Sequence, residues 1–88
     1  MSNRFEEIRA EIVENDKVII GAVNHRLELV AELWALKAQL GLDTVDPDRE
    51  RRLRAALAEA NAGRLSTSGL ERLTTDLLDL TKQELGSG

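Results

Sequence analysis

Residues 4–41 read RFEEIRAEIVENDKVIIGAVNHRLELVAELWALKAQLG, and the spacing of their apolar side chains decides the fold. Two seven-residue series of apolar positions run through this stretch, which is the periodicity of a helix and not of a strand. The series contain Phe5, Ile8, Ile12, Ile19, Ala22, Leu29, Leu33, Leu36 and Leu40. The pattern predicts one helix of about 37 residues, roughly 55 Å long, which ends at Gly41. Gly21, inside it, lowers helix stability by up to about 1 kcal/mol relative to alanine without breaking the pattern.

Two shorter helices are predicted after a connection at residues 42–47. Asp46 suits the N-cap of the second helix, Pro47 its first position, and acids follow in its first turn. This helix is predicted to run to about residue 60 or 61 and to bury Leu53, Ala56, Leu57 and Ala60. Ser66 or Thr67 then caps a third helix, which frays near residues 86–88. Its inward side chains are predicted to be Leu70, Leu73, Leu77, Leu78 and Leu80.

The fold class predicted from these patterns is all-α, with one very long N-terminal helix and two shorter ones in a single domain over residues 1–88. Leucine, alanine, glutamate and arginine dominate the composition, and the only aromatic residues are Phe5 and Trp34. A chain of this length buries a small fraction of its surface by itself. We therefore expect oligomerisation.

Composition argues against several classes of function. There is no cysteine, and His25 alone cannot make a metal site. The net charge of −4 disfavours nucleic acid as a partner, and the basic run at residues 49–54 is interpreted as a solvated helical face. The first residues lack the apolar core of a signal peptide, and no run approaches the roughly 18 apolar residues of a membrane span. We expect a cytoplasmic protein without a membrane partner.

Arg26 breaks the apolar seam of the long helix. Steps of seven residues give Phe5, Ile12, Ile19, Arg26, Leu33 and Leu40. A buried charge costs several kcal/mol unless an anion meets it. Lys37 lies eleven residues on, about 20° round the helix and roughly 16 Å along it. Two long cations can therefore close on a small dianion, although an acid of a partner helix could also pair with Arg26 and set the register of an assembly.

Arg9 lies too far along the same helix to join them within one chain. It precedes Arg26 by roughly 25 Å and Lys37 by roughly 42 Å of helix axis. Two long helices packed antiparallel in a two-fold dimer would instead bring Arg9 of one chain beside the other two cations of its partner. The alternative is that Arg9 is a surface residue paired with Glu6 or Glu7.

The chain resembles the all-helical chorismate mutases over nearly its full length. The resemblance rests on the joint spacing of Ile8-Arg9-Ala10-Glu11-Ile12, His25-Arg26, Lys37 and Asp46-Pro47-Asp48-Arg49-Glu50-Arg51. It implies an interlocked three-helix homodimer with two active sites, each of which takes one arginine from the partner's long helix. The implied reaction is the Claisen rearrangement of chorismate to prephenate, which uses no cofactor and forms no covalent intermediate.

The resemblance also implies roles for the cations. Arg26 and the partner's Arg9 would each hold one carboxylate of chorismate, in the bidentate geometry that a guanidinium offers. Lys37 would meet the ether oxygen together with a carboxylate. Arg49 would support the carboxylate cluster.

The remaining implied site residues come from the second and third helices. Glu50 would accept from the ring hydroxyl, helped by the backbone at Asp46, and its first-turn position also suits the helix dipole. In the family the third helix supplies a small hydroxyl residue, here Thr81, and one turn later a glutamine or glutamate that donates to the ether oxygen. Leu85 stands at that second position. Because a lost donor of this kind costs about 2.7 to 4 kcal/mol, we expect a mutase that is weak alone. Some relatives of this kind are activated by the first shikimate-pathway enzyme, DAHP synthase.

Two other functions stay open at this stage. An isochorismate pyruvate-lyase of the same fold is one, but those relatives generally lack the acid that follows the arginine of the second helix, whereas Glu50 is present here. A helical assembly domain without catalytic activity is the other. In that case Arg26 would serve only to set the register between chains.

Overall fold

The computed structural model describes residues 3–44 and 46–86, and these residues form helices and connections with no strand. The elements are α1 (Asn3–Leu40), α2 (Pro47–Ala60) and α3 (Thr67–Thr81), followed by a π-helical turn (Lys82–Gly86) that we call the C-terminal turn. The prediction of an all-α chain with one very long helix and two shorter ones is confirmed.

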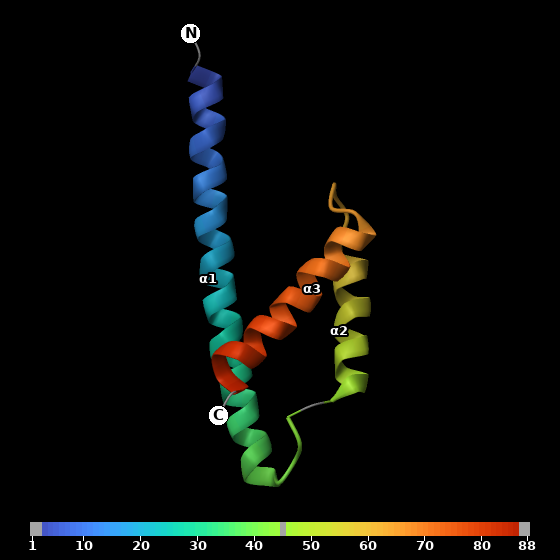
Figure 1. Ribbon diagram of the computed structural model, residues 1–88. Coiled ribbons are helices and arrows are strands. Elements are labelled where there is room, and N and C mark those ends of the chain that lie inside the picture. The colour runs from blue at the N-terminus through green and yellow to red at the C-terminus, as the bar shows by residue number, and fades with distance from the viewer. Residues whose placement is uncertain (1–2, 45, 87–88) are drawn as a thin grey trace.

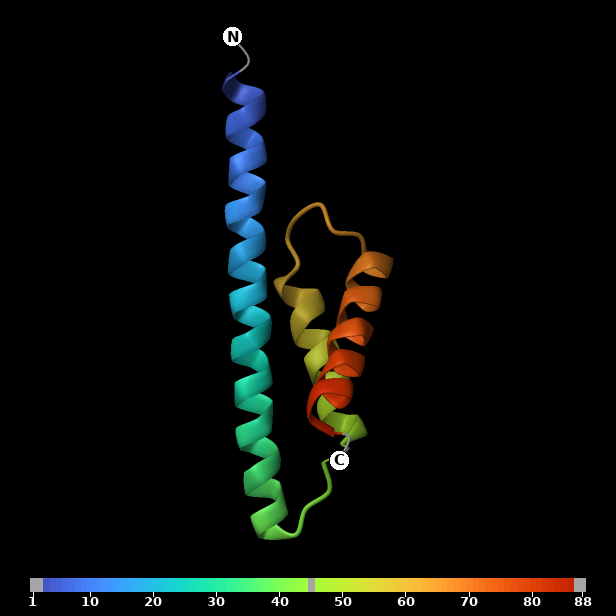
Figure 2. The same cartoon turned by 60° about the vertical axis from the view of Figure 1, so that its left-hand side comes forward.

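The molecule is an elongated rod with a helical hairpin at one side, and its principal dimensions are 62 × 24 × 17 Å. Helices α2 and α3 lie beside the C-terminal part of α1, and α3 runs back so that the C-terminal turn reaches α1 (Figure 1). The N-terminal part of α1 extends beyond both of them (Figure 2). No other part of the described residues covers that segment.

The end of α1 is a glycine-dependent turn, as the sequence predicts. Gly41 has φ of +72°, the left-handed region that a side chain disfavours. The N–H of Gly41 donates to the carbonyl of Ala38 at 3.2 Å, and the N–H of Leu42 donates to the carbonyl of Lys37 at 2.8 Å. These two bonds form a Schellman motif. The motif reverses the chain directly after Lys37 and so places the following connection near that residue.

Side-chain caps begin the other two helices. The Asp46 carboxylate accepts from the backbone N–H of Arg49 at 3.2 Å, with Pro47 as the first helical residue. The Ser66 hydroxyl accepts from the N–H of Gly69 at 3.0 Å. The caps predicted from the sequence are therefore confirmed, with Ser66 as the cap of α3 and Thr67 as its first residue.

The described part of the chain has no fully buried apolar side chain; the residues it buries are Thr74 and Thr81, which are 2% and 5% exposed. The prediction that Leu73 points inward is wrong for the single chain, since this side chain is 48% exposed. Thr74, about 100° further round the helix, takes the buried position instead. Ala56 and Ala60 of α2, also predicted to be buried, are exposed.

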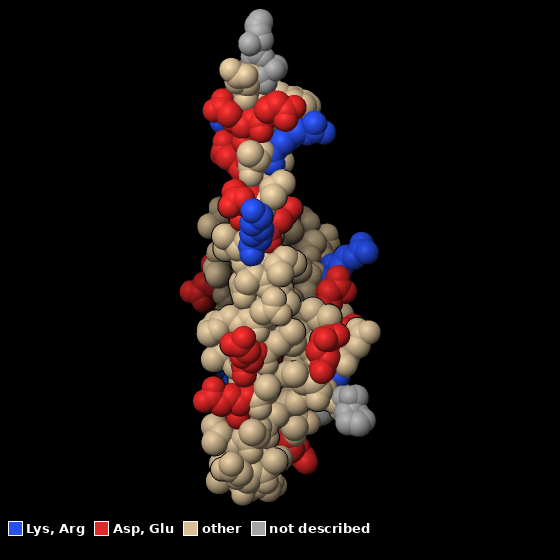
Figure 3. Space-filling model, turned by 90° about the vertical axis from the view of Figure 1, so that its left-hand side faces the viewer, with Lys and Arg blue, Asp and Glu red and all other residues tan. Residues whose placement is uncertain are grey.

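Helix α1 carries a long series of large apolar side chains in solvent. They are between 42% and 72% exposed and comprise Phe5, Ile8, Ile12, Val13, Val18, Ile19, Ile20, Leu29, Leu36 and Leu40. On the side of the molecule shown in Figure 3, charged side chains crowd the N-terminal end, and much of the surface further along is uncharged. Exposed apolar surface of this extent is unusual in a monomer and is typical of an interface. No helix among the described residues is both long and apolar enough to cross a membrane.

Arg54 ties α3 to α2. Its guanidinium donates to the Glu71 carboxylate at 3.0 Å and to the Thr75 hydroxyl at 3.1 Å. The Arg54 side chain is 30% exposed and that of Glu71 is 54% exposed, so solvent screens the ion pair in part. Two hydrogen bonds from one guanidinium nevertheless fix the orientation of α3, and with it the position of Thr81.

Replacing Arg54 by alanine should therefore lower the free energy of unfolding by about 1 kcal/mol, because the change removes both hydrogen bonds from Arg54 to α3. Arg51 is a matched control, since it lies on the same helix and pairs only with Asp48 within that helix. Urea unfolding followed by circular dichroism measures both variants. An equal effect of Arg54→Ala and Arg51→Ala would contradict a specific role for Arg54.

Candidate active site

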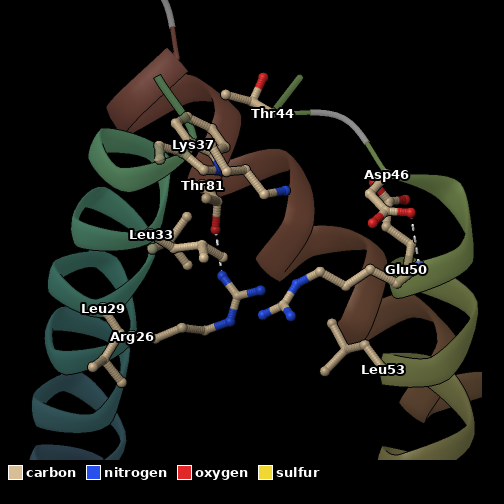
Figure 4. Close-up of a pocket in the computed structure, with 12 residues that line it drawn as sticks. Arg26, Leu29, Leu33, Lys37, Thr44, Asp46, Glu50, Leu53 and Thr81 are labelled. Atoms are coloured by element: carbon tan, nitrogen blue, oxygen red, sulfur yellow. Dashed lines mark hydrogen bonds between the residues drawn. The ribbon is translucent and has the colours of Figure 1, made fainter. Parts of the chain in front are cut away.

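A cavity of about 400 Å³ opens between α1, the start of α2 and the end of α3. Cavities of this volume are typical of sites for small molecules. Helix α1 supplies one wall, α2 and the preceding connection supply the opposite wall, and α3 contributes one hydroxyl (Figure 4). The lining residues are Arg26, Leu29, Val30, Leu33, Trp34, Lys37, Thr44, Asp46, Arg49, Glu50, Leu53 and Thr81.

Three cations line this cavity without an anionic partner. Arg26 and Lys37 extend from α1 into the space facing α2 (Figure 4), and Arg49 comes from the first turn of α2. Within residues 3–44 and 46–86, none of the three lies within 4.0 Å of a carboxylate oxygen. Like charges held around one small volume repel each other, and the repulsion is relieved when an anion enters. The cavity is therefore suited to an anionic small molecule.

Arg26 is held in place by a side chain from the other end of the sequence. Its Nη1 donates to Oγ1 of Thr81, which is 5% exposed. The same hydroxyl donates to the carbonyl of Leu77 at 2.8 Å. This chain of hydrogen bonds joins α1 to the last turn of α3.

Two carboxylates lie on the α2 side of the cavity, and their surroundings differ. Asp46 caps α2, so one of its carboxylate oxygens is occupied by the N–H of Arg49, and its carbonyl accepts from the N–H of Glu50 at 3.1 Å. Glu50 is half-buried and has no ion pair among the described residues. Its carboxylate is therefore able to accept a hydrogen bond from a hydroxyl of a ligand.

The apolar wall was not assigned to the site from sequence. Leu29 and Leu33 belong to the predicted seam of the long helix, so periodicity marked them as buried positions of an interface and not as cavity residues. Leu53 was predicted as a buried residue of the second helix, and Trp34 was noted only as one of the two aromatic residues. Thr44 lies in the connection, where no periodic signal exists, and only the folded chain brings it to the cavity.

The sequence-predicted site residues divide into two groups. Those that line the cavity together are Arg26, Lys37, Asp46, Arg49, Glu50 and Thr81. Arg9 does not line it: its side chain is 67% exposed, 3.9 Å from a carboxylate oxygen of Glu6, with its guanidinium 4.9 Å from the centre of the Phe5 ring. The contact with Glu6 is the alternative that the sequence left open, but at this distance and exposure it contributes little.

Leu85 lies in a neighbouring cavity of about 400 Å³, which it lines together with Trp34, Thr44, Glu50 and Thr81. Helix α3 ends at Thr81, and the C-terminal turn that follows has π-helical hydrogen bonding. A π-helical turn does not keep the register of an α-helix, so spacing along α3 does not carry over to Leu85. Gly86 lies against the Trp34 ring, where an added Cβ would be 3.4 Å away, and this contact seats the turn on α1.

No group of three or more histidine, cysteine or acidic side chains gathers as metal ligands in the part of the chain that the structure describes. Comparison with known families gives one match. Residues 8–84 match the family described as chorismate mutase type II, and this range includes every residue that lines the first cavity. A comparison with curated proteins found no match.

The unpaired cations predict that a small dicarboxylate stabilises the fold. Succinate should raise the melting temperature of the protein at constant ionic strength, since a ligand that binds only the folded state shifts unfolding by about 2.7 kcal/mol at a hundredfold excess over its Kd. Succinamide, with the same shape and no charge, is the control ligand. Differential scanning fluorimetry should show the increase for the parent and for Lys17→Gln, which lies outside the cavity, but not for Lys37→Gln. An equal increase with succinamide, or in Lys37→Gln, would exclude this cavity as the anion site.

Proposed function

The chain belongs to the chorismate mutase type II family, and from this membership we propose that it converts chorismate to prephenate in the cavity between α1 and α2. The observation that carries the proposal is the set of three cations that line one cavity and have no ion-pair partner among the described residues, beside the half-buried carboxylate of Glu50. Chorismate has two carboxylates, a ring hydroxyl and an ether bridge. These groups match the charges and acceptors that surround the cavity.

The proposed reaction requires no proton transfer and no covalent intermediate. The ether carbon–oxygen bond breaks while a new carbon–carbon bond forms between the side chain and the ring. Folding the side chain over the ring lowers its conformational entropy, which is part of the activation free energy. When the cavity holds chorismate in this conformation, binding supplies that part before the reaction begins. A cation placed where the ether oxygen gains negative charge stabilises the transition state. Both tasks suit a cationic cavity with apolar walls.

In this proposal each polar residue of the cavity has one role. Arg26 holds one carboxylate, with the fork geometry of its guanidinium, and Lys37 meets the ether oxygen together with a carboxylate. Arg49 supports the carboxylate cluster. Glu50 accepts from the ring hydroxyl beside the backbone of Asp46, whose carbonyl already orients the first turn of α2. Thr81 adds a hydroxyl from α3.

The second carboxylate is proposed to bind Arg9 of a second copy of the chain. Arg9 lies about 25 Å of helix axis from Arg26 in its own chain. An antiparallel two-fold pair of α1 helices would bring it to the partner's cavity and would cover the exposed apolar side chains of α1. The absence of a buried apolar core in the described residues supports this interlocked homodimer, because the single chain cannot account for its own stability.

Full activity is proposed to need a partner protein, as in relatives activated by DAHP synthase. Leu85 offers no hydrogen-bond donor, and it lines the neighbouring cavity. In the C-terminal turn, Gly86 lies against Trp34 of α1. A partner that moves this turn would change the groups next to the ether oxygen.

Arg26→Ala should lower kcat/KM for chorismate at least about a hundredfold, because the charge-assisted bidentate partner of one substrate carboxylate is lost. The dimer should stay folded, since the change removes a charge from the seam. Prephenate formation is measured with the purified chain, alone and with DAHP synthase added, and sedimentation gives the oligomeric state. Arg52→Ala, an exposed arginine of α2 outside the cavity, is the control.

Three results would contradict the proposal. Turnover of isochorismate with none of chorismate would favour the lyase. A parent without turnover of either, whose dimer dissociates on Arg26→Ala, would favour the assembly domain. An Arg26→Ala variant as active as Arg52→Ala would remove Arg26 from the site.

The shared site predicts a complementation result. Arg9→Ala and Lys37→Ala chains, each expected to be nearly inactive, are mixed by unfolding and refolding together. Random pairing makes about half of the dimers mixed, and in each of these one site collects both changes while the other has neither, so about a quarter of all sites should be intact. Activity should recover towards that fraction. If native mass spectrometry confirms mixed dimers and no activity returns, each site is built within one chain.

A further inference from the structure

The hydroxyl of Thr81 has one proton, which is used in a hydrogen bond within α3. Oγ1 donates to the carbonyl of Leu77 at 2.8 Å and accepts from Nη1 of Arg26. A threonine hydroxyl has one O–H donor and two acceptor lone pairs. While the bond to Leu77 persists, Thr81 has no proton to give to a carboxylate. Towards the three-cation cavity it acts as an acceptor.

The cation that donates to Thr81 is Arg26, which interrupts the apolar seam of α1. Arg26 is half-buried, and among the described residues Thr81 is its hydrogen-bond partner. An arginine side chain has many rotamers, and orienting it lowers the entropy lost when a ligand binds. One of its five N–H donors is used by Thr81, which leaves the remaining donors of the guanidinium for an anion.

We propose that Thr81 is a positioning residue for Arg26, and that its hydroxyl affects the reaction through the guanidinium and not by donating to the substrate. This inference rests on the proposed function and specifies how one residue of that site works. It links the end of α3 to the carboxylate-binding cation of α1. Any movement of the last turn of α3 would then be transmitted to substrate binding.

Thr74 provides a matched control on the same helix. It lies seven residues before Thr81, is 2% exposed, and its hydroxyl donates to the carbonyl of Leu70 at 2.8 Å. The bond from Thr81 to Leu77 has the same form. Thr74 does not line the cavity and has no bond to an arginine among those described. The two threonines therefore differ in the contact with Arg26.

The test compares Thr81→Val, Thr81→Ser and Thr74→Val by steady-state kinetics and thermal unfolding. Valine keeps the shape of threonine and removes the hydroxyl. Thr81→Val should lower kcat/KM for chorismate about tenfold or more, mainly through KM, because Arg26 binds a carboxylate present in both ground and transition states. Thr81→Ser should keep the parent value. Thr74→Val should lower the melting temperature by a similar amount to Thr81→Val and leave kcat/KM unchanged.

A double-mutant cycle separates action through Arg26 from direct contact with substrate. Lysine at position 26 keeps a cation and loses the guanidinium that Thr81 orients. In the Arg26→Lys background, Thr81→Val should change kcat/KM by less than about twofold, since coupled residues are not additive. A full tenfold loss there would mean that Thr81 contacts the substrate itself, and the inference would be wrong.

Failure of this inference is distinct from failure of the proposed function. A parent that does not turn over chorismate would remove the proposed function, and the succinate-dependent rise in melting temperature would then serve as the readout for the same variants. An active parent in which Thr81→Val and Thr74→Val behave alike would overturn the inference alone. If Thr81→Val does not fold, Thr81→Ala takes its place with the same expected loss.

Discussion

The length of α1 is the constraint on which the rest of this structure depends. Its 38 residues leave only two short helices and their connections to cover it, and these reach only its C-terminal part (Figures 1 and 2). Apolar side chains along the remaining length are exposed, and the described residues contain no apolar core. Burial of apolar surface is the main favourable term in folding. In the proposed homodimer, a second copy of the same helix would supply the missing burial.

The charges that line the cavity between α1, α2 and α3 determine which ligands it is able to bind. Arg26, Lys37 and Arg49 line one cavity, and among the described residues none of them forms an ion pair with an acid. Asp46 is engaged in capping α2, and Glu50, although it lines the same cavity, forms no ion pair with them among the described residues. The site thus stores a repulsion that an anionic ligand relieves. Membership of the chorismate mutase type II family gives this anion a proposed identity.

The position of the end of α3 depends on its contacts with the other two helices. Arg54 holds α3 against α2, Thr81 holds its last turn to Arg26, and Gly86 rests on Trp34. After Thr81 the chain leaves α-helical register. π-Helical turns occur frequently at functional sites, where they change the direction of side chains. In the proposed function, this segment is the one that an activating partner protein would move.

Local spacing in the sequence determined the helices, because caps, glycine and seven-residue periodicity act within a few residues. Spacing also singled out Arg26 and Lys37, and the resemblance to the all-helical chorismate mutases added Asp46, Arg49, Glu50 and Thr81. The structure places all six around one cavity. Spacing did not reveal the exposure of Leu73, the cavity contact of Thr44 or the loss of register before Leu85. These depend on how α1, α2 and α3 lie against one another. The bond from Arg26 to Thr81 spans 55 residues, and only tertiary structure decides a contact of that separation, since no helical period connects its ends.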